Sequence, residues 1–161
     1  MKSILVPIDC SAASTRIVDL ARQIAKAFAA EIHLIYVREI SPATLVAPTG
    51  YGVSGMPELM PMPIIDPAAQ TLPEKSHKAE LAKWQKEIEE AGVRATLHEP
   101  NGTVADEILK QADAVKADFI VMGSHGHGAM YNLLVGSVTE GVLKRSTRPV
   151  LLVPSAAKLT K

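Results

Sequence analysis

The residues best suited to chemistry form a glycine-rich stretch near the C-terminus of the 161-residue chain. Residues 123–137 read GSHGHGAMYNLLVGS and hold four of the ten glycines. An apolar run at residues 119–122 precedes them and is typical of a buried strand, and a helix is expected to begin at Ser137. Glycine permits close backbone approach, successive N–H groups form a concave nest, and a helix N-terminus adds unpaired donors. This order of elements predicts a site for a chain of phosphates.

The spacing of the glycines differs from the two most familiar phosphate-binding motifs. A P-loop needs a lysine, and neither lysine nor arginine occurs between Gly123 and Ser137. A dinucleotide fingerprint needs a third glycine where Tyr131 stands. The pattern that fits is Gly-x2-Gly-x9-Gly-Ser, made by Gly123, Gly126, Gly136 and Ser137. We therefore expect backbone N–H groups and the Ser137 hydroxyl to hold the phosphates.

This spacing and its neighbouring residues resemble the nucleotide-binding branch of the universal stress protein family. The similarity extends from ILVPID at residues 4–9 to RPVLLVP at residues 148–154 and is weakest in the middle of the chain. The resemblance implies ATP as the ligand, with ADP or AMP as alternatives and Mg²⁺ held by the phosphates. The residues that it assigns to the nucleotide are Pro7, Ile8, Asp9, Val37, Met122, Gly123, Ser124, His125, Gly126, Gly128, Gly136, Ser137, Val138 and Thr139.

The resemblance also implies a homodimer in which the last strands of two subunits pair antiparallel. The sequence agrees, because a monomer would leave an apolar edge strand exposed to aggregation, formed by Val150, Leu151, Leu152 and Val153. We expect this dimer to act on a further protein partner, which the sequence does not identify.

Length and composition are those of an ordinary globular domain. Residues 1–154 suffice for one hydrophobic core, and residues 155–161 form a short tail. Lys and Arg together number 17, as do Asp and Glu, so the net charge of zero gives no support for nucleic acid or an anionic membrane as a partner. No apolar run approaches the roughly 18 residues of a membrane span, strand-like sequence begins too early for a signal peptide, and one cysteine excludes an internal disulfide. We expect a cytoplasmic protein.

Hydrophobic periodicity predicts five strands alternating with four helices. The strands are expected at residues 2–7, 31–37, 93–98, 119–122 and 149–153. The helices are expected from Ala12 after an N-cap at Ser11, from Thr71 to a stop at Gly92, from residue 103 onward, and over residues 137–146. The predicted fold class is α/β, with an open doubly wound five-stranded parallel sheet in the Rossmann-like order 3-2-1-4-5 and helices on both faces.

This strand order predicts where a ligand binds. Ligands of open α/β sheets bind at the carboxyl ends of the strands where the order reverses, which here lies between the first and fourth strands. The loops that leave these strands carry Asp9 and the glycine-rich stretch, and the main chain of Val37, at the end of the second strand, would face an adenine edge. Topology and glycine spacing therefore select the same crevice independently.

Residues 38–72 differ in composition from the rest of the chain. They hold six of the eleven prolines and three of the six methionines, so little regular structure is expected. A loop of this length within a compact domain is usually functional or disordered. Two interpretations stay open, a mobile linker and a lid over the site or a flap on a partner subunit.

Two candidate site residues also have purely structural interpretations. Asp9 can cap the first helix instead of accepting a hydrogen bond from ribose or adenine. Ser137 and Glu140 have the spacing of a capping box, and a capped helix end can still bind an anion. Both interpretations of each residue remain open.

Other reactive side chains in this region carry little signal. His125 and His127 are too few to bind a metal ion by themselves. Cys10 stands where the family often has glycine, so its side chain can crowd the pocket, and no redox role is expected without a second thiol. Trp84 lies on the apolar stripe of the second helix and is expected in the core.

No pattern in the sequence supports catalysis. No lysine is placed to stabilise a transferring phosphoryl group, and Ser124 and His125 show no sign of a triad. Our first hypothesis is a cytoplasmic ATP-binding regulator of the stress response, which acts as a nucleotide-dependent switch or dimeric adaptor. The alternatives are a slow ATPase and a dimeric interaction module that no longer binds nucleotide.

Overall fold

A computed structural model describes residues 2–39, 71–124 and 135–154 of the chain. Their sheet has five strands in the order β3-β2-β1-β4-β5, and every pairing of neighbours is parallel. The strands are β1 (Ser3–Pro7), β2 (Glu31–Ile35), β3 (Ala95–His98), β4 (Phe119–Gly123) and β5 (Val150–Val153).

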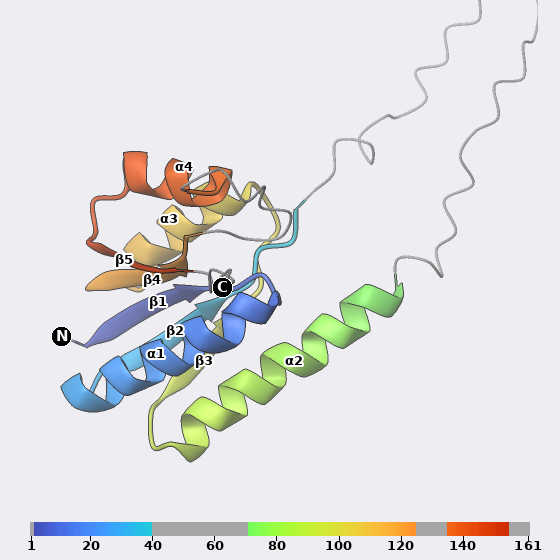
Figure 1. The fold of residues 1–161 in the computed structure, drawn as a ribbon, viewed down its shortest axis with the longest axis vertical. Coiled ribbons are helices and arrows are strands. Elements are labelled where there is room, and N and C mark those ends of the chain that lie inside the picture. Colours follow the sequence, from blue (N-terminus) through green and yellow to red (C-terminus); the bar gives the residue numbers. More distant parts are fainter. Residues whose placement is uncertain (1, 40–70, 125–134, 155–161) are drawn as a thin grey trace, which may run out of the picture.

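Four helices cover the two faces of this sheet. They are α1 (Ala12–Phe28), α2 (Thr71–Glu90), α3 (Val104–Ala114) and α4 (Ser137–Arg145). Figure 1 shows α1 and α2 on one face and α3 and α4 on the other. The predicted fold class and strand order are confirmed.

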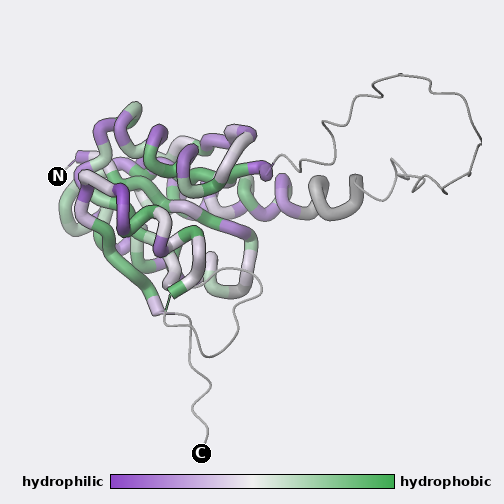
Figure 2. The backbone as a smooth tube through the Cα atoms, turned by 90° about the horizontal axis from the view of Figure 1, so that it is seen from above, coloured by the Kyte–Doolittle hydropathy of each residue, from purple (hydrophilic) through white to green (hydrophobic). Residues whose placement is uncertain are grey.

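Alternating side chains of the central strands divide the interior into two hydrophobic clusters. Ile4 and Val6 of β1 pack under α1 and α2, whereas Leu5 between them packs under α3 and α4. The strand is apolar at consecutive positions because helices cover both faces of a parallel sheet. Trp84 is 3% exposed within the first cluster, as predicted. Figure 2 shows hydrophobic segments of the backbone running through the interior of the described part of the protein.

The end of the second strand differs from the prediction. β2 ends at Ile35, so Val37 lies beyond the strand rather than at its end, and β3 likewise begins two residues later than predicted. Tyr36 still donates its N–H to the carbonyl of His98 (2.9 Å), which is the last residue of β3. Beyond the strand ends, Arg38 donates its N–H to the Pro100 carbonyl (2.9 Å), so the two segments continue side by side.

Helix α2 ends at Glu90, just before Gly92, the glycine that was predicted to stop it. Gly92 has φ +81°, a left-handed conformation that few other residues adopt without strain. Its N–H bonds to the carbonyl of Glu89 (2.8 Å), and the N–H of Val93 bonds to that of Ile88 (3.2 Å). This pair of bonds is a Schellman motif, which satisfies carbonyls that the helix itself leaves without donors.

Three predicted segments lie wholly or mostly outside the described residues. They are residues 40–70, which make up most of the predicted loop 38–72, residues 125–134, which include His125, Gly126 and Gly128, and the tail 155–161. Among the residues that are described, no helix combines the length and the apolar character needed to cross a membrane.

Candidate functional site

The carboxyl ends of three neighbouring strands bring most of the predicted site residues together. β1 lies between β2 and β4, so residues 7–9, Val37 and residues 122–124 leave the sheet at one edge. Ile8 remains tied to β2 through its N–H, which bonds to the Ile35 carbonyl (3.0 Å). The structure therefore gathers the described members of the predicted site at the point where the strand order reverses.

Two hydrogen bonds join the two ends of the glycine-rich stretch, and a third ties its first end to β5. Ser124 donates its N–H to the Val153 carbonyl of β5 (3.0 Å), and Gly136 donates its N–H to the Ser124 carbonyl (2.8 Å). The Thr139 hydroxyl of α4 donates to the Gly123 carbonyl at the end of β4 (3.0 Å). The start of α4 is thereby fixed against the end of β4, which is the arrangement that a phosphate cradle requires.

Helix α4 begins at Ser137 as predicted, but the alternative interpretation of Ser137 and Glu140 as a capping box is wrong. Gly136 is the N-cap, with extended backbone angles of φ −73° and ψ 156°, and its carbonyl accepts the N–H of Glu140 (2.8 Å). Ser137 is consequently the first helical residue, and no side chain caps the helix. The Glu140 carboxylate instead bonds to Lys144 (2.6 Å), and this contact lowers the pKa of Glu140.

This helix start leaves donors at the edge of the sheet. The N–H groups of residues 137–139 precede the first bond of the α4 ladder, so they have no acceptor within the helix. Ser137 is exposed there. Together with the positive end of the helix dipole, these groups form an arrangement that favours an anion.

Asp9 is held by a tight turn between β1 and α1. Its Oδ1 accepts the N–H of Ser11 (3.0 Å) and the hydroxyl of Ser14 (2.9 Å). Ser11 is the N-cap of α1 as predicted, although its side chain makes no capping bond. Ser14 was missed at the sequence level, although a serine on the apolar face of the first helix was a usable signal. Asp9 therefore holds the turn before α1 and is not its N-cap, and its role toward a ligand stays a prediction.

The backbone of Cys10 gives a physical reason for the glycine that the resembled family often has at this position. Cys10 has φ +58°, in the left-handed region that favours glycine. Its half-buried side chain packs against the cluster under α1 and α2. The turn that presents Asp9 therefore contains one strained residue.

We expect Cys10 to react slowly with alkylating reagents. Burial above all, and then the charges of Glu80 and Asp9, raise the pKa of its thiol from 9.0 to about 11. At about pH 8 the thiolate fraction falls roughly 100-fold, and the greater nucleophilicity of a more basic thiolate offsets roughly tenfold of this. Iodoacetamide should modify native protein roughly tenfold more slowly than protein unfolded in urea, as followed by mass spectrometry. Equal rates would contradict the raised pKa.

Several predicted site residues have side chains that are buried or already hydrogen-bonded within the protein. Ile8 and Met122 are only 6% and 4% exposed and belong to the two hydrophobic clusters, so a ligand can reach only their main-chain atoms. Val37 and Val138 are partly buried against the cluster under α3 and α4. Thr139 is 3% exposed, and its hydroxyl already bonds to a backbone carbonyl.

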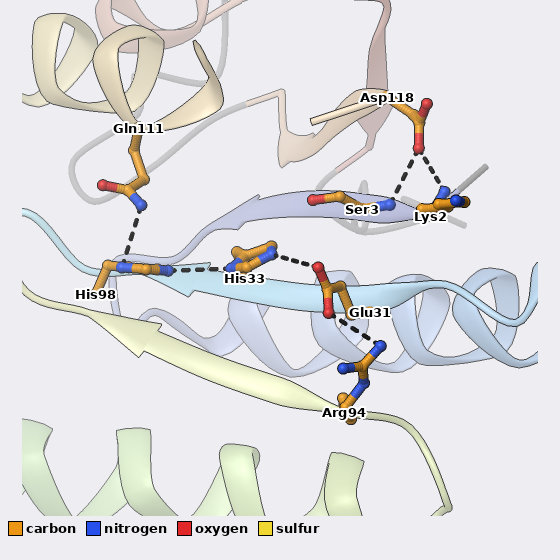
Figure 3. Close-up of polar contacts among 8 residues, drawn as sticks. All are labelled: Lys2, Ser3, Glu31, His33, Arg94, His98, Gln111 and Asp118. Carbon is orange, nitrogen blue, oxygen red and sulfur yellow. Dashed lines mark hydrogen bonds and ion pairs between the residues drawn. The ribbon is translucent and has the colours of Figure 1, made fainter. Parts of the chain in front are cut away.

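A second polar cluster lies on the face of β2 and β3 that carries α3. Figure 3 shows that it runs from Arg94 through Glu31, His33 and His98 to Gln111. Arg94 lies 3.4 Å from Glu31, whose other oxygen is 3.3 Å from His33 Nε2. His33 Nδ1 lies 3.1 Å from His98 Nε2, and His98 Nδ1 lies 3.1 Å from the Gln111 amide nitrogen. Nowhere in the described chain do three His, Cys, Asp or Glu side chains form a group able to hold a metal ion.

Comparison with known proteins agrees with this geometry. The model of the Universal stress protein family matches residues 1–154. Universal stress protein MJ0531 from Methanocaldococcus jannaschii is 36% identical over 157 residues, which cover 98% of this chain and 84% of the relative.

Two solved structures are similar in fold. That of protein MJ0577, from the same organism, has a TM-score of 0.76 and 26% identity, and the match covers 98% of each chain. A universal stress protein solved in complex with cAMP has a TM-score of 0.63 and 25% identity, over 96% of this chain and 98% of the other. Because the family model matches residues 1–154 and a curated relative is 36% identical over 98% of the chain, the chain belongs to the universal stress protein family.

Proposed function

We propose that this stress-response protein is a cytoplasmic regulator that binds ATP and, on binding, changes the surface that it offers to a protein partner. The observation that carries the proposal is the junction of β4 and α4, where Gly136 bonds to Ser124 and brings a helix N-terminus to the sheet's switch point. The structural relative in complex with cAMP supports an adenine nucleotide as the class of ligand.

Each part of the nucleotide has a chemically suitable group at this edge. The N–H groups of residues 137–139 and the exposed Ser137 hydroxyl suit the phosphates. Asp9, at the end of β1, offers a carboxylate to ribose or adenine. Mg²⁺ would accompany the phosphates, because this ion retains several waters and favours phosphate oxygens. ADP and AMP offer the same adenine and ribose groups with fewer phosphates.

Calorimetric titration with Mg-ATP tests the proposal directly. The wild-type chain should bind, and Gly136→Ala should lose most of the binding because a Cβ would enter the close approach between backbone and phosphates. Alanine can adopt the φ of −73° found at Gly136, so the fold should survive at a cost of up to about 1 kcal/mol for the poorer N-cap.

The outcomes of this titration separate the alternative functions. Unchanged affinity in Gly136→Ala would show that the site lies elsewhere. Absence of both binding and co-purified nucleotide in the wild type would favour an interaction module. Binding accompanied by turnover that Gly136→Ala abolishes would favour a slow ATPase.

We also propose a homodimer that pairs through β5. β5 lies at the edge of the sheet, and in the described chain its outer side has no partner strand. Leu151 on this strand is 39% exposed, which is unfavourable for a large apolar side chain on an open edge. Light scattering after gel filtration should give the mass of a dimer for the wild type and of a monomer for Leu151→Lys. A monomeric wild type would contradict the proposal.

A further inference from the structure

Ser14 is a fully buried polar residue in the first turn of α1. It is 0% exposed, and the next buried residues of this helix, Ile17, Val18 and Ala21, are apolar. A buried hydroxyl costs free energy unless it forms hydrogen bonds. Both bonds of Ser14 Oγ go to one residue, since it donates to Asp9 Oδ1 (2.9 Å) and accepts the Asp9 N–H in a longer contact (3.4 Å).

Two hydrogen bonds converge on one oxygen of Asp9. Oδ1 accepts the Ser14 hydroxyl and also the Ser11 N–H (3.0 Å). Two donors on one oxygen restrict the side-chain rotamer of Asp9. The left-handed backbone of Cys10 (φ +58°) forms part of the same turn. The Asp9 carboxylate, at the switch point of the sheet, is therefore fixed by hydrogen bonds from residues at the start of α1.

We infer that Ser14 is a positioning residue for nucleotide binding, which holds the Asp9 carboxylate ready to accept a hydrogen bond from the ribose or adenine of the ligand. The inference rests on the proposed function and assigns a role to a residue that would never touch the nucleotide itself. A carboxylate that is already ordered loses less conformational entropy when the ligand binds. Loss of the Ser14 hydroxyl should therefore weaken binding through Asp9 and leave the phosphate contacts unchanged.

Two ligands separate these contributions. ATP contains ribose, adenine and phosphates, whereas inorganic tripolyphosphate contains the phosphates alone. Ser14→Ala should weaken ATP binding roughly tenfold, as expected for a hydrogen bond to a charged group. Its affinity for tripolyphosphate should stay within about twofold of the wild type, because the start of α4 is held by other residues.

The same turn offers a matched control. Ser11→Ala also removes a serine hydroxyl, but it keeps the backbone N–H that bonds to Asp9 Oδ1, and the Ser11 side chain makes no capping bond. This variant should bind ATP like the wild type. A double-mutant cycle gives a second readout, because Ser14→Ala should have almost no further effect on ATP affinity in a chain that carries Asp9→Ala. A merely structural role would not produce this coupling.

The outcomes distinguish the two proposals. If the wild-type chain does not bind ATP, the proposed function fails and the inference fails with it. If the wild type binds ATP and Ser14→Ala binds it equally well, the positioning role alone is overturned. Equal losses for ATP and tripolyphosphate would also overturn it, because they would indicate a general disturbance of the site.

Discussion

Thr139→Val should lower the free energy of unfolding by about 1–3 kcal/mol, the usual cost of leaving a buried hydrogen-bonding group without its partner. Valine has nearly the shape of threonine, but it cannot donate to the Gly123 carbonyl. Thr139 is 3% exposed, so water cannot easily replace the lost bond. Because this bond holds α4 against the end of β4, its loss should also weaken nucleotide binding. Urea unfolding and calorimetric titration of the same preparations measure the two effects.

Thr139→Ser is the control for this prediction. Serine keeps the hydroxyl and loses one methyl group, so stability should fall by no more than about 1 kcal/mol and binding should be nearly unchanged. The pair also tests the sequence-based assignment of Thr139 to the nucleotide. A hydroxyl that contacts the ligand directly would make Thr139→Val weaken binding at unchanged stability, and that result would contradict the internal role described here.

The fold, and the convergence of the described candidate site residues at one end of the sheet, were predictable because both depend on patterns that can be recognised in the sequence. Apolar runs separated by helical periodicity defined the strands, and parallel crossovers restricted their order. The order then selected the edge where residues 7–9 and 122–124 meet, and the glycine spacing selected the same edge. Neither inference needed the conformation of any single residue.

The details of the site depend on such conformations and were not predictable. A Ser-x-x-Glu pattern has the same residues whether a helix is capped at position 136 or 137, and only the extended backbone of Gly136 decides between them. The contact of Ser14 with Asp9 requires a turn in which Cys10 adopts a positive φ, an uncommon conformation for a cysteine.

The paired histidines show a second limit, which is strand register. His33 and His98 are 65 positions apart, and they meet because β2 and β3 pair with Ile35 opposite His98. A register shifted by one residue would move one ring to the opposite face of the sheet. No local pattern around either histidine indicates this contact.

When both histidine rings are neutral, one placement of their protons gives each hydrogen bond of this cluster a donor and an acceptor. Gln111 donates to His98 Nδ1, the Nε2–H of His98 donates to His33 Nδ1, and the Nε2–H of His33 donates to Glu31. His98 can take up a proton at Nδ1 if the Gln111 amide turns over and presents its oxygen to that nitrogen.

Acidification should destabilise the fold, because the surroundings of His98 in the folded state disfavour its charged form. Burial, and then the charge of His33, hold the pKa of His98 below its ordinary value of 6.5. As the pH falls below that value, the unfolded chain takes up this proton before the folded chain does. The contribution of His98 to stability is thus present above about pH 6.5 and is lost as the pH falls toward the lower pKa of the folded state. The slope cannot exceed about 1.4 kcal/mol per pH unit, and we expect a fraction of it because the ring is only partly buried.

Thermal unfolding at a series of pH values, from about 7.5 down to about 5, measures this effect through the shift of Tm for each variant. His98→Gln cannot titrate, so its Tm should fall less than that of the wild type over the same interval. Gln111→Glu places a carboxylate beside His98 Nδ1, where it should favour the protonated ring and also reduce the fall. His98→Gln removes the charge on the ring, whereas Gln111→Glu pairs that charge with a carboxylate. A smaller fall of Tm in both variants would assign the pH dependence to His98. Parallel curves for the wild type and His98→Gln would show that the acid sensitivity arises elsewhere.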